Sequence, residues 1–592
     1  MLEQTLKKYF GYDQFRAGQQ SIIHDLIQER KALGILPTGG GKSVCYQVPA
    51  LHFEGITLVI SPLISLMKDQ VDALVAAGIQ ARYMNSSMSR QAIRDVEQEL
   101  LRGEIKLLYV APERFNNEYF INILKKVNIE MIAFDEAHCI SQWGHDFRPS
   151  YRESIDIIKK LFPSSRYIAL TATATNEVKT DILNLLNIPP HCTTINSIER
   201  PNLTLKVNPT YQRQKFIVEY IKEHSKSPGI IYVSTRKNVE SLSEYLSSQG
   251  IDCLAYHGGM SNNDRIEQQR AFMYDEKRVI VATNAFGMGI DKSNIRFIIH
   301  YNMPGDIESY YQEVGRAGRD GQPSECILLY SEKDIDLQQF FIDQSNGSED
   351  YIQKQRDKLN EMIRYKRTKQ CLEAFIIHYF NPNQRLNECG RCSNCKSKDK
   401  TYDMTIEAQK IVSALYRIKD DIASELFIQM LRGEENQEIL SRELNNIRTY
   451  GILKEYKTKE VRHLLDELIY KGYVYLTDEG LRCHESIKSI LFDGKKVYTY
   501  PFKVKVKEIV DISTHKDIDQ VLLDRLYDIR KKLSAKHNVA PIMIFQDHII
   551  KEFSKKMPTS KKEMMNISGI GNYKLKHYCP LFIDEIKSYL AQ

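Results

Sequence analysis

The 592-residue sequence has no apolar run long enough to span a lipid bilayer, and its N-terminal stretch lacks the apolar core of a signal peptide. Low-complexity tracts are absent as well, and a hydrophobic content of 42% is ordinary for a soluble globular protein. We therefore expect a cytoplasmic location, or a nuclear one in a eukaryote. A chain of this length does not fold around one core, so we expect about three to five domains.

A disulfide framework is also missing. The eleven cysteines are an odd number, and seven of them are scattered singly, which indicates a reducing compartment. The other four form a cluster, in which Cys389, Cys392 and Cys395 follow a C-x2-C-x2-C spacing and Cys371 lies eighteen positions before Cys389. Four thiolates at this spacing suit tetrahedral Zn²⁺, although an iron–sulfur cluster also uses four cysteines.

Excess charge is absent from most of the chain. Residues 501–592 carry 17 Lys and Arg against 11 Asp and Glu, whereas the first 500 residues carry 65 of each sign. A basic terminal domain suggests contact with a polyanion, although a solvated lysine-rich surface has the same composition.

Tryptophan is the rarest residue, and the only one is Trp143 in DEAHCISQWGHDFRP, residues 135–149. His145, Phe147 and Arg148 lie in the same stretch. A large aromatic side chain is usually part of a core. An aromatic residue beside an arginine can also stack on nucleic-acid bases, so composition alone leaves both interpretations open.

Two sets of short apolar segments alternate with helical patterns, which predicts two α/β domains with parallel sheets. The first set is KALGILP, ITLVISP, IKLLYVAPE, EMIAFDE and SRYIALTA, and the second set is GIIYVST, DCLAYHG, RVIVATN, IRFIIHYN and ECILLYS. We expect the two domains to join near residues 197–208. Ligands should bind outside the carboxyl ends of the strands.

A nucleotide site is indicated by LPTGGGKS, residues 36–43, which lies between a predicted strand and a helical pattern. Its glycines let backbone N–H groups surround phosphates, and Lys42 and Ser43 are placed to reach the phosphates and Mg²⁺. The usual P-loop has glycine at the position of Leu36, so the match is to a variant. Asp135 and Glu136 end another predicted strand. Such a pair often caps a helix, but in a domain with a phosphate loop it can hold Mg²⁺ and activate water.

The second predicted domain contains QEVGRAGRDG, residues 312–321. Arg316 and Arg319 are three positions apart, so on a helix they point the same way. Two such arginines are often surface charge, but guanidinium groups supplied across a cleft stabilise a transferring phosphoryl group. Together the two domains predict a motor whose cleft closes on ATP.

Nine segments, in order, resemble motifs of the RecQ family of DNA helicases, which belongs to helicase superfamily two. They are GYDQFRAGQ, LPTGGGKS, SPLISLMKDQ, APER, DEAHCISQWGHDFRP, TATAT, YHGGM, ATNAFGMGIDK and ESYYQEVGRAGRDG. The resemblance extends through both predicted motor domains, and a leucine at position 36 is usual in this superfamily.

The resemblance implies roles for individual residues. ATP binding is implied for Tyr12, Arg16, Gln19, Thr38, Gly39, Gly40, Gly41, Lys42 and Ser43, with magnesium at Ser43 and Asp135. Catalysis is implied for Lys42, Asp135, Glu136, Gln312, Arg316 and Arg319, and coupling of the two domains for Thr171 and Thr173. Contact with single-stranded DNA is implied for Trp143, His145, Phe147 and Arg148, which match the aromatic-rich loop of the family.

The same resemblance interprets the rest of the chain. It selects a structural zinc site at Cys371, Cys389, Cys392 and Cys395, followed by a winged helix whose hairpin is short. The basic end resembles the helicase-and-RNase-D C-terminal (HRDC) domain, and ISGIG has the form of a helix–hairpin–helix turn whose N–H groups can contact phosphates. Tyr573, Lys574 and Lys576 are the DNA-contacting candidates there.

The expected fold class is therefore α/β, with two RecA-like parallel-sheet motor domains, a helical zinc-binding subdomain, a winged helix and a small all-α HRDC domain. The expected bounds are residues 1–200, 201–345, 346–402, 403–500 and 515–592.

The resemblance implies an ATP-dependent 3′–5′ DNA helicase that translocates on single-stranded DNA and unwinds duplex or branched DNA in recombination, repair, replication and the SOS response. Its cofactors would be Mg²⁺ with ATP and Zn²⁺. Its candidate protein partners are a single-stranded-DNA-binding protein and other repair proteins, at the nucleoid in a bacterium. Two other functions are alternatives to a DNA helicase. Intact Lys42, Glu136 and Arg319 argue against a scaffold without turnover, and the downstream modules argue against an RNA helicase.

Overall fold

The computed structural model describes residues 2–591 apart from residues 87, 145, 211, 288–291, 346, 382–383, 385, 387, 398–401, 419–420, 478–479, 500–518 and 538. The chain divides into two compact units, Met1–Cys395 with Thr514–Gln592 and Lys396–Ser513. Within the described ranges, each helix is too short or too polar to cross a membrane.

The first α/β domain is built on a seven-stranded parallel sheet. Its strands are β1 (Lys31–Ile35), β2 (Ile56–Ile60), β3 (Ala81–Met84), β4 (Leu107–Val110), β5 (Ile129–Phe134), β6 (Arg166–Thr171) and β7 (Thr193–Ile195). They lie in the order β3-β4-β2-β5-β6-β1-β7. The five predicted strands of this domain are confirmed. The two edge strands, β3 and β7, escape prediction because they are short and keep half-exposed residues instead of a continuous apolar run.

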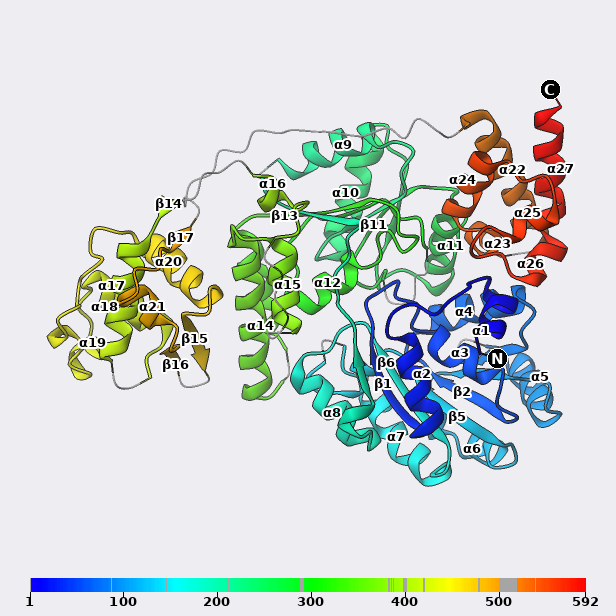
Figure 1. The fold of residues 1–592 in the computed structure, drawn as a ribbon, viewed down its shortest axis with the longest axis horizontal. Helices are drawn as coiled ribbons and strands as arrows, with labels where there is room; N and C mark the ends of the chain where they lie inside the picture. The colour runs from blue at the N-terminus through cyan, green and yellow to red at the C-terminus, as the bar shows by residue number, and fades with distance from the viewer. Residues whose placement is uncertain are drawn as a thin grey trace. The chain divides into compact units, whose positions relative to one another are not determined.

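Helices cover both faces of this sheet (Figure 1). They are α1 (Leu2–Thr5), the π-helix η1 (Leu6–Phe10), α2 (Gln19–Gln28), α3 (Val44–Ala50), α4 (Ile64–Ala76), α5 (Arg90–Leu101), α6 (Glu118–Leu124), α7 (Pro149–Leu161) and α8 (Asn176–Leu186). Because the strands are apolar on both sides, two separate buried clusters form, one on each face of the sheet.

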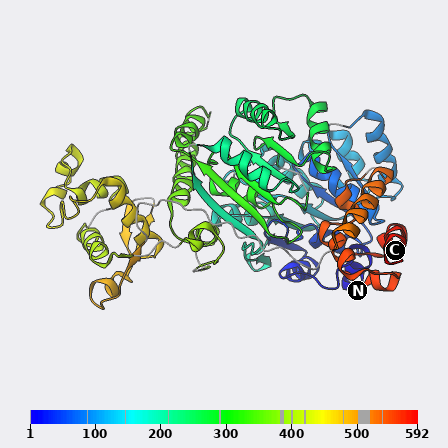
Figure 2. The ribbon, with the colours of Figure 1, turned by 90° about the horizontal axis from the view of Figure 1, so that it is seen from above.

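The second α/β domain has a six-stranded parallel sheet. Its strands are β8 (Leu203–Pro209), β9 (Gly229–Tyr232), β10 (Cys253–Tyr256), β11 (Val279–Ala282), β12 (Phe297–His300) and β13 (Ser324–Tyr330), in the order β10-β11-β9-β12-β13-β8. Figure 2 shows these strands side by side between helices. The helices are α9 (Arg213–Glu223), α10 (Arg236–Ser248), α11 (Asn262–Met273) and α12 (Ile307–Val314). The predicted joining segment, residues 197–208, already contains most of strand β8, so the connection is shorter than expected.

A helical subdomain follows, with α13 (Lys333–Asp343), α14 (Glu349–Arg367), α15 (Leu372–Phe380) and α16 (Ser393–Lys396). Its apolar residues do not form a core of their own. They share one buried cluster with the second α/β domain, and Cys371 and Cys392 belong to that cluster.

The unit Lys396–Ser513 has its own core. Its helices are α17 (Thr405–Arg417), α18 (Ser424–Arg432), α19 (Gln437–Ser441), α20 (Thr458–Tyr470) and α21 (Ile487–Leu491). The predicted hairpin is present as β15 (Val474–Thr477) and β16 (Gly480–Cys483), and β14 (Tyr402–Asp403) pairs with β17 (Tyr498–Thr499). The two residues at the hairpin tip lie outside the described part of the chain.

The C-terminal domain is entirely helical in its described residues. Its helices are α22 (Gln520–His537), α23 (Pro541–Ile544), α24 (Asp547–Lys556), α25 (Lys561–Met565), α26 (Asn572–His577) and α27 (Cys579–Leu590), around one apolar core. The fold class expected from the sequence, two parallel-sheet domains followed by helical modules, is confirmed.

Candidate nucleotide, metal and nucleic-acid sites

One cavity of about 250 Å³ collects the predicted nucleotide residues from both α/β domains. Its lining includes Tyr12, Arg16, Gln19, Thr38, Gly39, Gly41, Lys42, Ser43, Asp135, Glu136, Gln312, Arg316 and Arg319. Gly40 belongs to the same loop but does not line the cavity. The sequence-predicted residues, which are up to 307 positions apart, thus meet at the carboxyl ends of parallel strands.

Two of the predicted ATP-binding side chains, those of Gln19 and Arg16, hold the phosphate loop in place. Gln19 donates to the carbonyl oxygens of Gly40 and Gly41 at 3.1 and 2.9 Å, and Arg16 donates to that of Gly39 at 2.6 Å. Gly39 and Gly41 have φ of 80° and 75°, a region that side chains rarely adopt. The loop therefore needs glycine at both positions to turn its N–H groups toward a bound anion.

The two acids follow β5 and differ in their environments. Burial, together with repulsion from Glu136, raises the pKa of Asp135 to about 7, and Lys42 opposes this shift. Glu136 has a left-handed backbone, φ 46°, which is strained for a non-glycine residue. Its carboxylate lies 3.4 Å from Nδ1 of His138, which also contacts the Thr171 hydroxyl at 2.9 Å. A divalent cation bound beside Asp135 and Ser43 would offset the burial of the Asp135 charge.

Arginines of the second domain reach the same cavity. Arg316 is buried, and burial lowers its pKa from the ordinary value for arginine. Sequence patterns do not single out a further arginine, Arg200, in the segment between the domains. Its guanidinium donates to the carbonyl oxygens of Thr38 at 2.6 Å and of Gly315 at 3.2 Å, so it joins the phosphate loop to the arginine motif.

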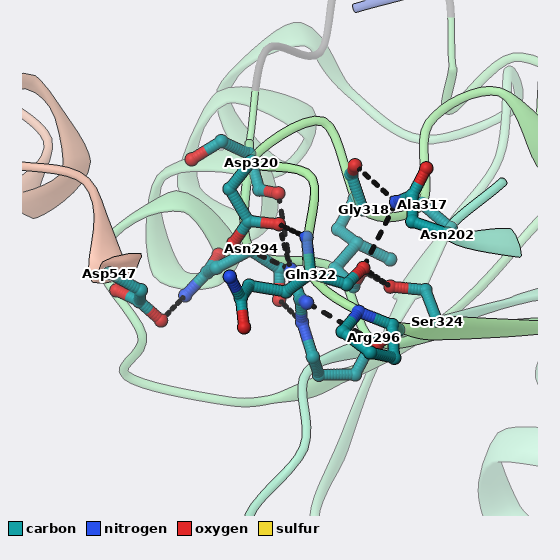
Figure 3. A network of polar contacts seen from close by, with 12 residues as sticks. Asn202, Asn294, Arg296, Ala317, Gly318, Asp320, Gln322, Ser324 and Asp547 are labelled. Carbon is teal, nitrogen blue, oxygen red and sulfur yellow. Dashed lines mark hydrogen bonds and ion pairs between the residues drawn. The ribbon is translucent and has the colours of Figure 1, made fainter. Parts of the chain in front are cut away.

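The C-terminal domain also reaches this cleft, which the sequence does not predict. Gln546 lines the cavity. Figure 3 shows the neighbouring Asp547 directed at Asn294 of the second α/β domain, with 3.1 Å between the amide nitrogen and the carboxylate oxygen. Arg530 holds the same carboxylate at 2.6 Å. The terminal domain is thus anchored beside the arginine motif, close to Asp320 (Figure 3).

The four predicted cysteine ligands meet in one cluster, with all Sγ atoms within 4.8 Å of one another. Backbone N–H groups of Leu372 and Cys395 donate to the sulfur of Cys392, both at 3.4 Å. A hydrogen bond from Cys371 lowers the pKa of the Cys392 thiol to about 4. Four converging sulfurs with N–H donors around them fit a closed tetrahedral zinc site.

The predicted aromatic loop, residues 141–148, begins five residues after Glu136 in the sequence. Trp143 is half-buried and packs against the core of the first α/β domain, whereas Phe147 is exposed. Arg148 bonds Asp146 at 3.2 Å and the carbonyl oxygen of Pro62 at 2.5 Å. His145 lies outside the described residues.

The predicted DNA-contacting turn of the terminal domain packs on the first α/β domain. The Gly569 N–H, one of the groups expected to be available to phosphates, instead donates to the carbonyl oxygen of Gly11 at 2.9 Å. Tyr573 lies against Gly78, and burial lowers the pKa of Lys574 to about 8. Lys576 is exposed. A DNA contact of the three side chains stays a prediction.

Five family models match the chain in succession. They are the DEAD/DEAH box helicase at residues 16–181, the helicase conserved C-terminal domain at 212–321, RecQ zinc-binding at 332–396, the RQC domain at 398–508 and the HRDC domain at 519–586. The fold, the shared cavity and these matches define an ATP-hydrolysing helicase that uses Mg²⁺ with ATP and carries structural zinc.

Curated relatives identify the family. The chain is 43% identical to the ATP-dependent DNA helicase RecQ of Bacillus subtilis over 99% of its own length and 98% of that protein. It is 38% identical to the Haemophilus influenzae protein of the same name, covering 99% and 96%, and 33% identical to ATP-dependent DNA helicase Q-like 2 of Arabidopsis thaliana, covering 98% and 82%. The chain belongs to the RecQ family of DNA helicases.

Proposed function

We propose that this RecQ-family helicase moves 3′ to 5′ along single-stranded DNA and unwinds duplex or branched DNA in recombination, repair and replication. The observation that carries the proposal is the single cavity lined by the phosphate loop and acids of one domain and by the arginines of the other. Because neither domain holds the full set, hydrolysis depends on their closure, and closure can be coupled to movement on DNA.

Within this cavity each group has a distinct role. Lys42 neutralises the β- and γ-phosphates, while Ser43 and Asp135 hold Mg²⁺. Glu136 orients and activates the attacking water, because it is the acid at the strained position nearest the metal ligand. Arg319, with Gln312 and Arg316, stabilises the charge that develops on the transferred phosphoryl group. Tyr12, Arg16 and Gln19 form the adenine end of the site.

Contact with single-stranded DNA is assigned to the aromatic loop. The exposed ring of Phe147 and the accessible part of Trp143 offer stacking surfaces for bases. The loop follows Glu136 within a few residues. Nδ1 of His138 lies 2.9 Å from the Thr171 hydroxyl and 3.4 Å from the Glu136 carboxylate. A base that displaces the loop can therefore change the position of the acid that activates water.

For the domains we keep the expected bounds, residues 1–200, 201–345, 346–402, 403–500 and 515–592, as part of the proposal. Tyr573 and Lys574 would contact DNA only when the terminal turn leaves the first α/β domain, because it packs there, whereas Lys576 is already exposed. We place the enzyme in the cytoplasm at the bacterial nucleoid, with a single-stranded-DNA-binding protein and other repair proteins as partners.

The test compares ATP hydrolysis and strand separation on three substrates, a 3′-tailed DNA duplex, a 5′-tailed DNA duplex and an RNA duplex. We expect hydrolysis stimulated by single-stranded DNA and unwinding of the 3′-tailed DNA alone. Unwinding of the 5′-tailed duplex instead would show that the enzyme moves 5′ to 3′. Preferential unwinding of the RNA duplex would mean that the substrate is RNA and not DNA. If single-stranded DNA did not stimulate ATP hydrolysis, the whole proposal would be contradicted.

A further inference from the structure

Helix α14 of the zinc-binding subdomain places two lysines on the aromatic loop of the first α/β domain. Lys354 and Lys358 are four residues apart, so both side chains project from one face of the helix. The ammonium of Lys354 lies 3.3 Å from the centre of the Trp143 ring, and that of Lys358 donates to the Trp143 carbonyl oxygen at 3.2 Å. The only tryptophan is therefore held through its ring and through its backbone.

Lys358 makes a second contact, with the helix that leads into the arginine motif. Its ammonium lies 3.1 Å from the carboxylate of Glu308, and the two side chains are 18% and 6% exposed. Burial by itself lowers the pKa of Lys358, but the carboxylates of Glu308 and Asp306 raise it overall, so the ammonium stays charged. A buried charged pair of this kind fixes the positions of both partners.

Glu308 lies on α12, one turn before Gln312, and the helix ends at Val314, two residues before Arg316. The contact between α12 and α14 is reinforced by Tyr310 and Tyr365, whose rings lie 5.2 Å apart and whose hydroxyls lie 3.4 Å apart. Helix α14 is thus firmly packed on the helix that positions the arginines. A displacement of the aromatic loop can act on α12 through the ammonium group of Lys358.

We propose that Lys354 and Lys358 form a latch between the aromatic loop and the arginine-motif helix, which single-stranded DNA opens when a base takes the place of Lys354 on Trp143. Lys354 holds the stacking face of the ring in the absence of DNA. Lys358 is a positioning residue that transmits the movement of the loop to Glu308 and so to Arg316 and Arg319. The latch rests on the proposed contact between Trp143 and DNA.

Because Trp143 is the only tryptophan, its fluorescence reports the latch directly. The full-length enzyme is titrated with a single-stranded oligo(dT), and the emission of Trp143 is measured beside the rate of ATP hydrolysis at each concentration. Lys354→Met should change the emission before DNA is added. It should lower the oligo(dT) concentration for half-saturation about two- to fivefold, the value of one partly exposed cation–π contact, with little change in maximal kcat.

Lys358→Met should separate binding from turnover. The emission change on adding oligo(dT) should persist, whereas the DNA-stimulated kcat should fall about tenfold, as expected for one lost charge-assisted hydrogen bond. Lys358→Arg should retain most of the stimulation, because it keeps the charge and the donors. Lys358→Met leaves the Glu308 carboxylate buried without this partner, which could affect folding. The double variant Lys358→Met/Glu308→Gln is therefore the folding control. It should show the same loss of DNA-stimulated kcat and a normal zinc content.

Arg356→Gln is the matched control, because it removes one positive charge from the same helix at a side chain that is 53% exposed. It should behave as the unchanged enzyme in both measurements. A stimulated kcat in Lys358→Met equal to that of Arg356→Gln would overturn the latch. Weaker oligo(dT) binding by Lys354→Met would do so too, because it would make Lys354 a phosphate contact. If the unchanged enzyme shows no emission change with oligo(dT), the proposed DNA contact of Trp143 itself fails.

Discussion

The two α/β domains share an architecture but divide the chemistry between them. Both are built on parallel sheets. The functional residues of the first domain follow strands or begin helices, whereas those of the second lie at the C-terminal end of α12 and just beyond it. The first carries a lysine, a hydroxyl and two acids, which suit binding of a nucleotide with its metal, whereas the second contributes Gln312, Arg316 and Arg319 to the same cavity. In the proposed mechanism, the first domain therefore binds the nucleotide and its metal, and the second domain stabilises the transition state.

The domains also differ in how their sheets are covered. Each face of the first sheet has an apolar cluster made of its own helices. One face of the second sheet instead shares its cluster with α14, α15 and two cysteines of the zinc site. Part of the core of the second domain therefore lies beside the cysteine cluster, whereas the core of the first domain does not.

The largest expected effect comes from removing the phosphate lysine of the first domain. Lys42→Ala should lose both nucleotide affinity and hydrolysis, with kcat/KM reduced by more than about 10³-fold, because the proposed role of Lys42 is to contact the phosphates in the ground state and in the transition state. A nucleotide-binding titration and an ATPase assay with single-stranded DNA measure the two losses. Retained turnover would show that the phosphate site is misplaced.

Arg319→Ala sharpens the comparison, because it removes a group of the second domain only. Hydrolysis should fall about 10³-fold, the contribution of an arginine finger, while the affinity for a non-hydrolysable ATP analogue changes little. Arg319→Lys keeps the charge without the planar fork and should recover only part of the rate. A loss of affinity as large as that of Lys42→Ala would contradict the division of roles.

Cys392→Ser tests the dependence of the second domain on zinc. We expect less than one zinc per chain and a lower unfolding temperature, since a structural metal site contributes its binding energy to folding. The destabilisation should reach residues of the second sheet and spare the first, which hydrogen exchange of the two sheets distinguishes. A full metal complement in this variant would mean that the ligand set is wrong.

The sequence predicts the strands and the cavity well for a physical reason. Ten of the predicted strands are confirmed because a strand buried on both faces needs a continuous apolar run. The phosphate loop can also be predicted from the sequence, because close approach of the backbone to an anion requires glycine at fixed positions, as at Gly39 and Gly41.

Contacts between segments far apart in the chain cannot be predicted from this sequence, and the reason is again physical. Arg200, Lys358 and Gln546 are ordinary polar residues whose partners lie 115 or more positions away or in another domain. Their role depends on how helices pack across the cleft, which leaves no periodicity or spacing in the sequence. The packing of the ISGIG turn against Gly11 is of the same kind, since a turn suited to phosphates also fits a peptide carbonyl.

Trp143→Ala addresses the link between DNA and the first domain. Nucleotide affinity should remain, while stimulation of hydrolysis by single-stranded DNA should fall at least about tenfold, since base stacking on one aromatic ring contributes that much. Trp143→Phe keeps an aromatic face and serves as the control. Normal stimulation and unwinding by the alanine variant would return Trp143 to a purely structural role.

The smallest expected effect concerns the terminal domain. This domain contacts both α/β domains, so it does not belong to only one side of the comparison between them. Asn294→Ala removes the hydrogen bond from the second domain to Asp547 but leaves the Arg530–Asp547 pair intact. We expect a loss of about 1.5 kcal/mol, the low end for a hydrogen bond to a charged group, because Asn294 is buried. Thermal unfolding of the full chain should shift slightly, whereas Asp547→Ala should shift it further, because Arg530 is then left buried without its carboxylate. Equal shifts in the two variants would mean that the contact with Asn294, and not the internal pair, holds the terminal domain on the second sheet's side of the cleft.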